Sequence, residues 1–368
     1  MKTANIRPPV PGDPECYRVA VVKWQHDDDI ATVIGDELQA LGHVPLLFCH
    51  TEAIPQNVDV VFSFAPYGNF LHVPRQLARI PSEQRPTFVH WNTEGLPDLR
   101  LPWRLVRTIA AGRSWLERRL LRGNDQGHRL NQRMLRFRYV GDYYYAYTKG
   151  WLNVFADSSA IYARWHRQHG LPAIFTPWGA TPRWYRNLHL ERDIDVLWMG
   201  SRGSRRRNHL LLQLQRELSR HSVTFHLADN VENSFIFGEN RIRFLNRAKI
   251  TLNLTRTWYD DNFSRFALAA PNRSLIVSEP LLPHCPDYEA GVHYVSAPIE
   301  KLSETILYYL AHEEERQRIV ENACHLVTTK LTFHNSIKVI MDAVARARPA
   351  VGYDRREDKR WMRQHKRQ

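Results

Sequence analysis

The chain has 368 residues, a formal net charge of +13 and an apolar fraction of 43%, and 24% of its residues are charged. This length predicts two domains, each large enough for a core of its own, and the composition is that of a globular protein. No run of about 18 uncharged apolar residues occurs, so the sequence predicts no transmembrane helix. Segment 1–18 lacks the apolar core of a secretory signal, and we therefore expect a cytoplasmic protein.

The cysteines favour the same compartment. The chain has four, which are far apart and form no CxxC pair: Cys16, Cys49, Cys285 and Cys324. Cysteines spaced in this way are typical of reduced thiols, and they predict neither a disulfide framework nor a structural zinc site.

The strong positive charge favours an anionic partner, which is a nucleotide sugar, a phospholipid surface or a nucleic acid. The charge is concentrated between residues 101 and 140, where ten arginines, from Arg104 to Arg138, face only two acids. A second basic stretch, 354–368, lies at the end of the sequence.

The first half of the chain alternates apolar strands with helical patterns. Strands are predicted at 17–24, 44–49, 58–63, 87–91, 152–157 and 173–178, with a helix at about 30–41 after the first strand. Near-continuous apolar strands that alternate with helices predict a doubly wound parallel sheet. Two arginine-rich helices, at 101–121 and 128–137, are predicted as an insertion in this domain.

The alternation restarts after a polar linker at about 181–192. We therefore predict an N-terminal domain at 1–181, a C-terminal domain at 193–345 and a basic tail at 346–368. In the second domain a strand at 195–199 precedes the basic glycine loop 200–207, and Asn208 is the predicted cap of the next helix. A strand–loop–helix–strand unit at 250–277 places its loop at the carboxyl edge of a parallel sheet, where open α/β folds bind ligands.

Two Rossmann-like halves, with the stronger ligand signals in the second, are the layout of GT-B glycosyltransferases. The C-terminal half resembles the group 1 glycosyltransferase superfamily, particularly its spore-maturation-protein-like branch, through segments 196–201, 248–253, 265–279 and 291–295. The resemblance implies two Rossmann-like doubly wound domains facing a cleft. It also implies transfer of a sugar from a nucleotide diphosphate donor to a hydroxyl acceptor, with retention of anomeric configuration and with no bound metal or other cofactor.

The superfamily usually has two glutamates eight positions apart, one for the donor sugar and one for the ribose. Here Asp260 or Asp261 falls at about the first position, whereas Ala267 or Leu268 occupies the second. Two further residues, Glu279 and Asn272, are the candidate replacements for the missing ribose contact. Asp260 and Asp261 also suit the first turn of a helix. The missing glutamate leaves open a non-catalytic nucleotide- or sugar-binding protein on the same scaffold.

The basic loop 200–207 is the predicted diphosphate site. A loop between a strand and a helix presents backbone N–H groups and a helix N-terminus to phosphate, and arginines bind phosphate oxygens in pairs. Its glycine pattern is not GxGxxG, so a solvated basic turn is the alternative. The predicted donor-binding residues are Gly200, Ser201, Arg202, Arg207, Asn253, Arg256, Asn262, Arg265, Asn272 and Glu279.

The acceptor is expected to approach from the first domain, where polar residues end a parallel strand. His90 or Glu94 would deprotonate or orient the acceptor hydroxyl, although a histidine at a strand end also suits a structural role. The predicted catalytic residues are His90, Glu94 and Asp261, and the predicted acceptor contacts are His26, Tyr67 and Asn92. Asp28 or Asp29 is the predicted cap of the first helix, and no metal site is expected.

The arginine-rich region from Arg104 to Arg138 has three interpretations. Basic amphipathic helices dock on anionic membranes, which would bring the enzyme to the inner face of a membrane and to a lipid-linked acceptor. The plain alternative is a solvated helical face. Nucleic-acid binding is disfavoured, because the tyrosines at 143–147 could stack on bases but no recognised binding signature accompanies them.

Overall fold

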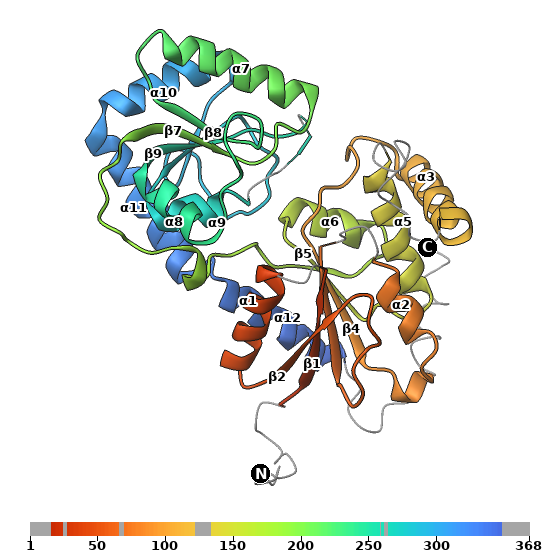
Figure 1. Ribbon diagram of the computed structural model, residues 1–368. Helices are drawn as coiled ribbons and strands as arrows, with labels where there is room; N and C mark the ends of the chain where they lie inside the picture. Colours follow the sequence, from red (N-terminus) through yellow and green to blue (C-terminus); the bar gives the residue numbers. More distant parts are fainter. Residues whose placement is uncertain are drawn as a thin grey trace, which may run out of the picture.

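The computed structural model describes residues 16–24, 28–65, 70–121, 134–257, 259–260 and 264–347. It contains two parallel sheets, of six and five strands, each covered by helices (Figure 1). The predicted α/β class with two Rossmann-like domains is confirmed. Within the described ranges, no helix is both long and apolar enough to cross a membrane.

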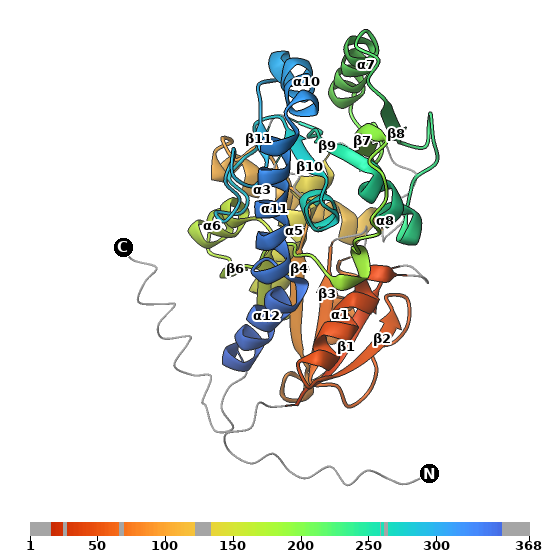
Figure 2. The same ribbon diagram turned by 90° about the vertical axis from the view of Figure 1, so that its left-hand side faces the viewer.

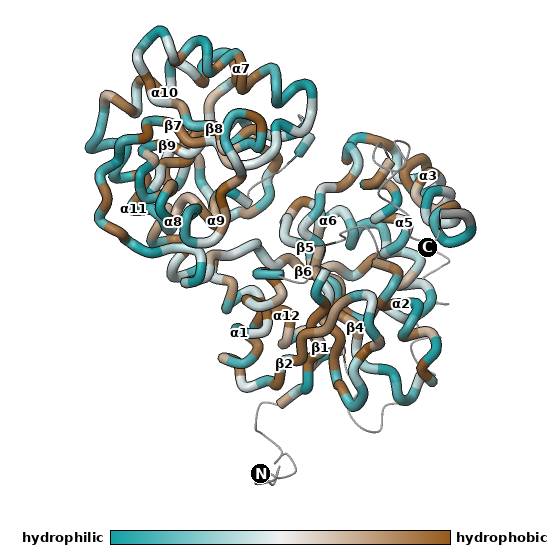
Figure 3. Tube along the Cα trace, viewed as in Figure 1, coloured by the Kyte–Doolittle hydropathy of each residue, from teal (hydrophilic) through white to brown (hydrophobic). Residues whose placement is uncertain are grey.

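The first sheet has the strand order β2-β1-β3-β4-β5-β6. Its strands are β1 (Arg18–Lys23), β2 (Val44–Cys49), β3 (Val60–Phe64), β4 (Thr87–Asn92), β5 (Val154–Asp157) and β6 (Ala173–Phe175). The helices that follow its strands are α1 (Asp29–Ala40), α2 (His72–Leu77) and α6 (Ala160–Gln168), with the 3-10 turn η1 (Ser82–Gln84) between α2 and β4. Figure 3 shows hydrophobic residues concentrated along strands such as β1 and β4, as expected for parallel strands buried on both faces.

The sequence left Asp28 and Asp29 as alternative caps of α1, and the structure shows that Asp28 is the cap. Its Oδ1 accepts a hydrogen bond from the Ala31 N–H at 3.1 Å.

The arginine-rich insertion folds as α3 (Trp103–Leu116), the π-helical turn η2 (Glu117–Leu121) and α5 (Leu135–Thr148). Helices α3 and α5 lie so close that a Cβ at Gly141 would be 2.1 Å from the Ala110 carbonyl oxygen. The predicted end of the second helix at residue 137 was wrong, because α5 continues through the tyrosines. Tyrosine and glycine are weak helix formers, and packing against α3 and the sheet stabilises α5 instead. Tyr143 is fully buried there and is not available to stack on bases.

The second sheet has the order β11-β10-β9-β7-β8. Its strands are β7 (Ile194–Met199), β8 (Phe225–Ala228), β9 (Ala248–Asn253), β10 (Leu275–Ser278) and β11 (Val295–Ser296). Its helices are α7 (Arg205–Ser219), α8 (Gly238–Arg247), α9 (Phe266–Ala269), α10 (Leu302–Ala311) and α11 (Glu313–Thr329), with 3-10 turns η4 (Ala270–Asn272) and η5 (Ile299–Lys301). Asn208 was the wrong cap for α7, since the helix begins three residues earlier and Ser204 caps it.

The chain crosses between the domains twice, and the two crossings lie side by side. The first contains η3 (Pro182–Trp184), and the second leads from α11 into α12 (Phe333–Ala347), which returns to the first domain and packs on α1, β4 and β5 (Figure 2). The backbones are joined by hydrogen bonds from Ala180 N to Leu331 O (2.9 Å) and from Phe333 N to Ala180 O (2.8 Å). The Phe333 ring packs among the rings of Trp91, Trp178 and Trp184. These contacts fix the domains at one side of their interface.

Candidate active site

The loop between β7 and α7 is shaped by two glycines with positive φ angles, Gly200 (118°) and Gly203 (65°). A Cβ at Gly200 would lie 3.0 Å from Nη2 of Arg265, so only glycine leaves room for this guanidinium. Ser204 accepts the Arg207 N–H (3.2 Å) and donates to the Arg256 carbonyl oxygen (2.7 Å). The loop after β7 is thereby held against the loop after the neighbouring strand β9, at the carboxyl edge of the sheet.

Two arginine side chains lie around the ring of Trp198, which is fully buried on β7. The Cζ of Arg265 is 4.0 Å and that of Arg207 5.3 Å from the ring centre. The indole N–H of Trp198 donates to the Gly200 carbonyl oxygen at 2.7 Å, which fixes the ring relative to the loop. Contacts of this kind orient the guanidinium groups but do not neutralise their charge.

Neither arginine forms a salt bridge with a carboxylate among the described residues. Arg207 is 2% exposed and donates from Nη1 to the Ser201 carbonyl oxygen, while its Nε and Nη2 have no hydrogen-bond partner among the described residues. Arg265 is 7% exposed and donates to the Met199 carbonyl oxygen (2.9 Å) and to Asn253 Oδ1 (3.1 Å). Buried cations without a counter-charge are costly, so this geometry favours an anionic ligand.

The electrostatics of the cluster agree with this inference. Burial, with repulsion from Arg256, lowers the pKa of Arg207 to about 10. Burial, with repulsion from Arg207 and Arg256, lowers the pKa of Arg265 well below its usual value. An anion bound among the three guanidinium groups would relieve both effects.

The other charged residues predicted at this loop already have internal partners. Arg202 donates to Asp229 and, at 2.7 Å, to Glu232. Arg206 binds both oxygens of Glu279, which also accepts the N–H (2.7 Å) and the hydroxyl (3.0 Å) of Thr255. Direct contact of a donor with Arg202 or Glu279 would have to replace these bonds, and their predicted roles stay predictions.

Of the three asparagines predicted at the donor site, the two that the structure describes lie at opposite edges of the second sheet. Asn253 ends β9 near the arginines, where it donates to Ser278 Oγ (3.1 Å) and accepts from Arg265. Asn272 precedes β10, at the amino edge, and its amide donates to the carbonyl oxygens of Trp184 and Leu268. The structure therefore does not bring Asn272 to the basic loop, because residues before and after a parallel strand lie at opposite edges.

Glu94 approaches the arginines from the first domain. Its loop is held by Asn92, whose Nδ2 donates to Asp157 Oδ2 (2.8 Å) and to the Glu94 carbonyl oxygen (3.0 Å). Burial raises the pKa of the half-buried Glu94 carboxyl, nearby Asp260 adds to the rise, and Arg256 and Arg136 oppose it. Asn92 is 1% exposed and also accepts from the Tyr143 hydroxyl, so its position suits holding this loop more than contacting an acceptor.

An ion pair between the domains lies beside Glu94. Arg136, on α5, donates to Asp260 of the second domain at 2.9 Å and to the Leu96 carbonyl oxygen at 3.1 Å. Its guanidinium covers Gly95, where a Cβ would lie 3.0 Å from Cζ. The sequence analysis missed this role, because nothing in the sequence distinguishes Arg136 from the other arginines of the same stretch.

His90 does not reach the interface between the domains, and the expectation that it faces this interface was wrong. The side chain is fully buried among the rings of Phe70, Tyr143 and Phe155, and burial lowers its pKa to about 3. Its Nδ1 lies 3.2 Å from Ser63 Oγ. Helix α5 covers this side of β4, so the catalytic role predicted for His90 has no support in its position.

Four predicted site residues lie outside the described residues: His26, Tyr67, Asp261 and Asn262. Among the residues that are described, no group of three or more His, Cys, Asp or Glu side chains is arranged to hold a metal ion.

Comparison with known proteins gives a family match over part of the chain and structural neighbours over most of it. Residues 205–342 match the model of a family described as glycosyl transferase-like, and no curated protein matches the chain by sequence. A glycosyltransferase from Rickettsia africae has a similar structure, with a TM-score of 0.58 and 10% identity over 91% of this chain and 99% of that one. The chain has the GT-B fold. The family model matches less than half of the chain, so membership of group 1 and of its spore-maturation-protein-like branch stays a prediction.

Two further GT-B structures are similar over most of their length. Sucrose-phosphate synthase from Thermosynechococcus elongatus has a TM-score of 0.56 and 8% identity over 90% of this chain and 98% of that one. HepE of Anabaena, solved in complex with UDP-glucose, has a TM-score of 0.53 and 10% identity over 89% of this chain and 99% of that one. At such identities these structures establish the fold and leave the reaction to be argued from the residues.

The same substitution should change the free energy of unfolding differently at two adjacent arginines. Arg206→Met would leave the buried Glu279 without its charged partner and should lower the free energy of unfolding by about 3 kcal/mol. Arg207→Met removes a buried cation without a carboxylate and should change it by less than about 1 kcal/mol or increase it. Urea unfolding of the unliganded proteins measures both. Equal losses would show that Arg207 is a structural charge.

Glu94→Gln should stabilise the unliganded protein in a pH-dependent way. The raised pKa of Glu94 means that its favourable contribution is fully present below the ordinary value of 4.5 and is lost as the pH rises through the folded-state pKa. The variant should therefore melt at the same temperature as wild type at pH 4 and above it at pH 7. Glu191→Gln, at an exposed residue of the linker, is the control for loss of one negative charge. An equal rise in its melting temperature at pH 7 would contradict this prediction.

Proposed function

We propose that the protein transfers a sugar from a nucleoside diphosphate sugar to a hydroxyl acceptor. The observation that carries this proposal is the pair of buried guanidinium groups of Arg207 and Arg265 around Trp198, without a carboxylate partner among the described residues. A diphosphate supplies the missing negative charge. Because HepE was solved with UDP and with UDP-glucose, a uridine diphosphate sugar is the donor to test first.

The same groups would assist the departure of the diphosphate. Negative charge builds up on its oxygens as the bond to the anomeric carbon breaks, and fixed donors at that position lower the barrier. The proposed donors are Arg207 and Arg265, the rim residue Arg256, and the N-terminus of α7, where Ser201 and the glycine loop lie. Because these arginines provide the positive charge, we propose that transfer proceeds without a bound metal.

On the acceptor side, we propose that Glu94 orients the attacking hydroxyl by accepting its hydrogen bond. Its carboxyl interacts electrostatically with Arg256 and Asp260 of the second domain, and burial raises its pKa above the ordinary value, which makes the carboxylate a stronger acceptor for a hydroxyl proton. Retention of anomeric configuration, which rests on the family resemblance alone, would pass the hydroxyl proton to the departing diphosphate. Asn92 would keep Glu94 in place.

UDP should raise the melting temperature of the wild-type protein, and UDP-glucose should be hydrolysed slowly in the absence of an acceptor. Arg207→Met and Arg265→Met should abolish the thermal shift and lower hydrolysis by about 10²- to 10³-fold, because each removes a donor to the developing charge. Activity should persist in EDTA.

Arg220→Met, on the exposed C-terminal end of α7, carries the same charge change outside the site and should behave as wild type. A thermal shift with no turnover of any nucleotide sugar would favour the non-catalytic binding protein. Absence of both would refute the donor-site assignment.

We further propose that the outward face of α3 docks the enzyme on an anionic membrane carrying its acceptor. This face exposes Trp115 (52%) and Leu105 (48%) together with Arg104 and Arg107. Figure 1 shows α3 at the periphery of the first domain, on the side away from the second. Exposed aromatic and aliphatic side chains beside arginines suit the interface of an anionic bilayer.

Vesicles containing phosphatidylglycerol should retain the protein at low salt, and retention should fall steeply as salt screens the arginines. Trp115→Ser and the double variant Arg104→Gln, Arg107→Gln should each weaken retention by about tenfold. The double variant Arg216→Gln, Arg220→Gln on α7 keeps the same net charge and should bind as wild type. Equal loss in both double variants would mean that net charge, and not this helix face, causes binding.

A further inference from the structure

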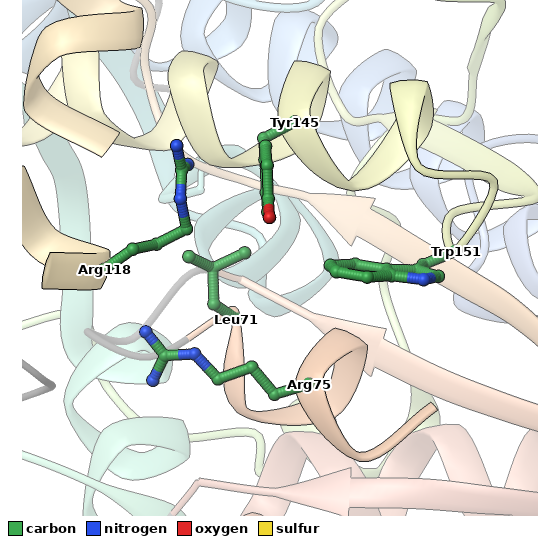
Figure 4. A pocket seen from close by; sticks show the side chains of 5 residues that line it. All are labelled: Leu71, Arg75, Arg118, Tyr145 and Trp151. Carbon is green, nitrogen blue, oxygen red and sulfur yellow. The ribbon is translucent and has the colours of Figure 1, made fainter. Parts of the chain in front are cut away.

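A polar cavity lies on the first domain, separate from the arginines around Trp198. It has a volume of about 410 Å³ and is lined by Leu71, Arg75, Arg118, Tyr145 and Trp151 (Figure 4). Leu71 and Arg75 come from the start of α2, Arg118 from η2, Tyr145 from α5, and Trp151 from the segment between α5 and β5. The volume falls within the range of small-ligand pockets and suits one or two sugar rings.

The aromatic part of the lining presents apolar faces with polar groups at their edges. The rings of Tyr145 and Trp151 meet edge to face, with centroids 5.6 Å apart and planes at 82°. Figure 4 shows the Tyr145 side chain pointing from α5 into the cavity, with the Trp151 ring at one end of it. Such amphipathic rings match a pyranose, which has apolar C–H faces and hydroxyls around its edge.

The charged part of the lining is entirely basic. The Cζ of Arg118 lies 3.6 Å from the centre of the Tyr145 ring, and the guanidinium donates to Ser114 Oγ. Within the described ranges, neither Arg75 nor Arg118 forms a salt bridge, and no acidic residue lines the cavity. Guanidinium groups without carboxylates bind carboxylate or phosphate oxygens in pairs.

The rest of the lining argues against a lipid. Leu71 is the only aliphatic residue among the described lining residues, so this part of the lining offers no apolar channel for an acyl chain. We propose that this cavity is a binding site for an acidic carbohydrate, a sugar unit that carries a carboxylate or a phosphate. The sugar ring lies against Trp151 and the edge of Tyr145, one face of which Arg118 covers, and the acidic group lies between Arg75 and Arg118.

The cavity runs along the side of the first domain. Leu71 follows β3 at the carboxyl edge of the sheet, towards the second domain, whereas Trp151 precedes β5 at the amino edge. At about 3.3 Å per residue, no more than about 20 Å separates Trp151 from the end of β5. An oligosaccharide held here by an acidic unit reaches from the cavity towards Glu94. Its role as part of the acceptor rests on the proposed transferase function, whereas binding of the acidic sugar does not.

Isothermal titration calorimetry on the full-length protein tests the binding site with a glucuronate-containing disaccharide and with glucose 6-phosphate. Maltose and inorganic phosphate are the matched neutral and sugar-free probes. Wild type should bind the two acidic sugars at least tenfold more tightly than either control. Arg75→Gln, Arg118→Gln and Trp151→Leu should each weaken this binding about tenfold or more. Arg79→Gln, an exposed arginine next to α2 and outside the cavity, should leave it unchanged.

Several outcomes would overturn the proposal: no binding of either acidic sugar, equal binding of maltose, or inorganic phosphate binding as tightly as glucose 6-phosphate. Phosphatidylglycerol vesicles that bind through Arg75 and Arg118 while the acidic sugars do not would assign the cavity to a lipid headgroup. The UDP-dependent melting shift, measured on every variant, should stay as in wild type. Loss of acidic-sugar binding with this shift intact separates failure here from failure of the donor site.

Discussion

The proposed site depends on one arrangement, in which two guanidinium groups share the ring of Trp198 and have no carboxylate partner among the described residues. Two neighbouring arginines of the loop after β7 do form ion pairs. Arg202 pairs with Asp229 and Glu232, and Arg206 pairs with both oxygens of Glu279. The acids of this region therefore pair with Arg202 and Arg206 and not with the two arginines that contact Trp198. The positive charge of Arg207 and Arg265 is thereby available to a ligand.

The remaining features of the interface between the domains bring Glu94 of the first domain towards the two arginines around Trp198. The first-domain turn that Asn92 fixes carries Glu94, and the Arg136–Asp260 ion pair lies beside it. A second contact, from the Ala160 N–H to the His284 carbonyl oxygen, joins the N-terminus of α6 to the loop after β10. Together with α12, these contacts set the two carboxyl edges opposite each other. The proposed donor and acceptor groups then come from different domains, as the division of the chain predicts.

The sequence predicts the strands and the basic loop because apolar runs and glycine–arginine patterns are local. It does not predict which arginine lacks a carboxylate partner. The arginines of the loop are chemically identical, and the acids that pair with two of them, Asp229 and Glu279, lie far along the chain. The misplacement of His90 has a similar cause. Its orientation depends on α5, whose tyrosines and glycine give a weak helical signal, and α5 is stabilised mainly by packing. Asn272 was misplaced because the strand–loop–helix–strand unit 250–277, to which it belongs, spans both edges of the second sheet.

The replacement of the usual second glutamate has a physical consequence in this site. Of the two residues that could occupy this position, Ala267 is 1% exposed in α9 and Leu268 packs against the core of the second domain, so neither supplies a polar side-chain contact. Glu279, a candidate substitute, is bound by Arg206 and Thr255, and Asp260 is bound by Arg136. These carboxylates therefore pair with other arginines, while Arg207 and Arg265 have no carboxylate partner among the described residues. Under the proposed function, recognition of the donor rests on its diphosphate more than on its ribose, because the diphosphate supplies the negatively charged partner for Arg207 and Arg265.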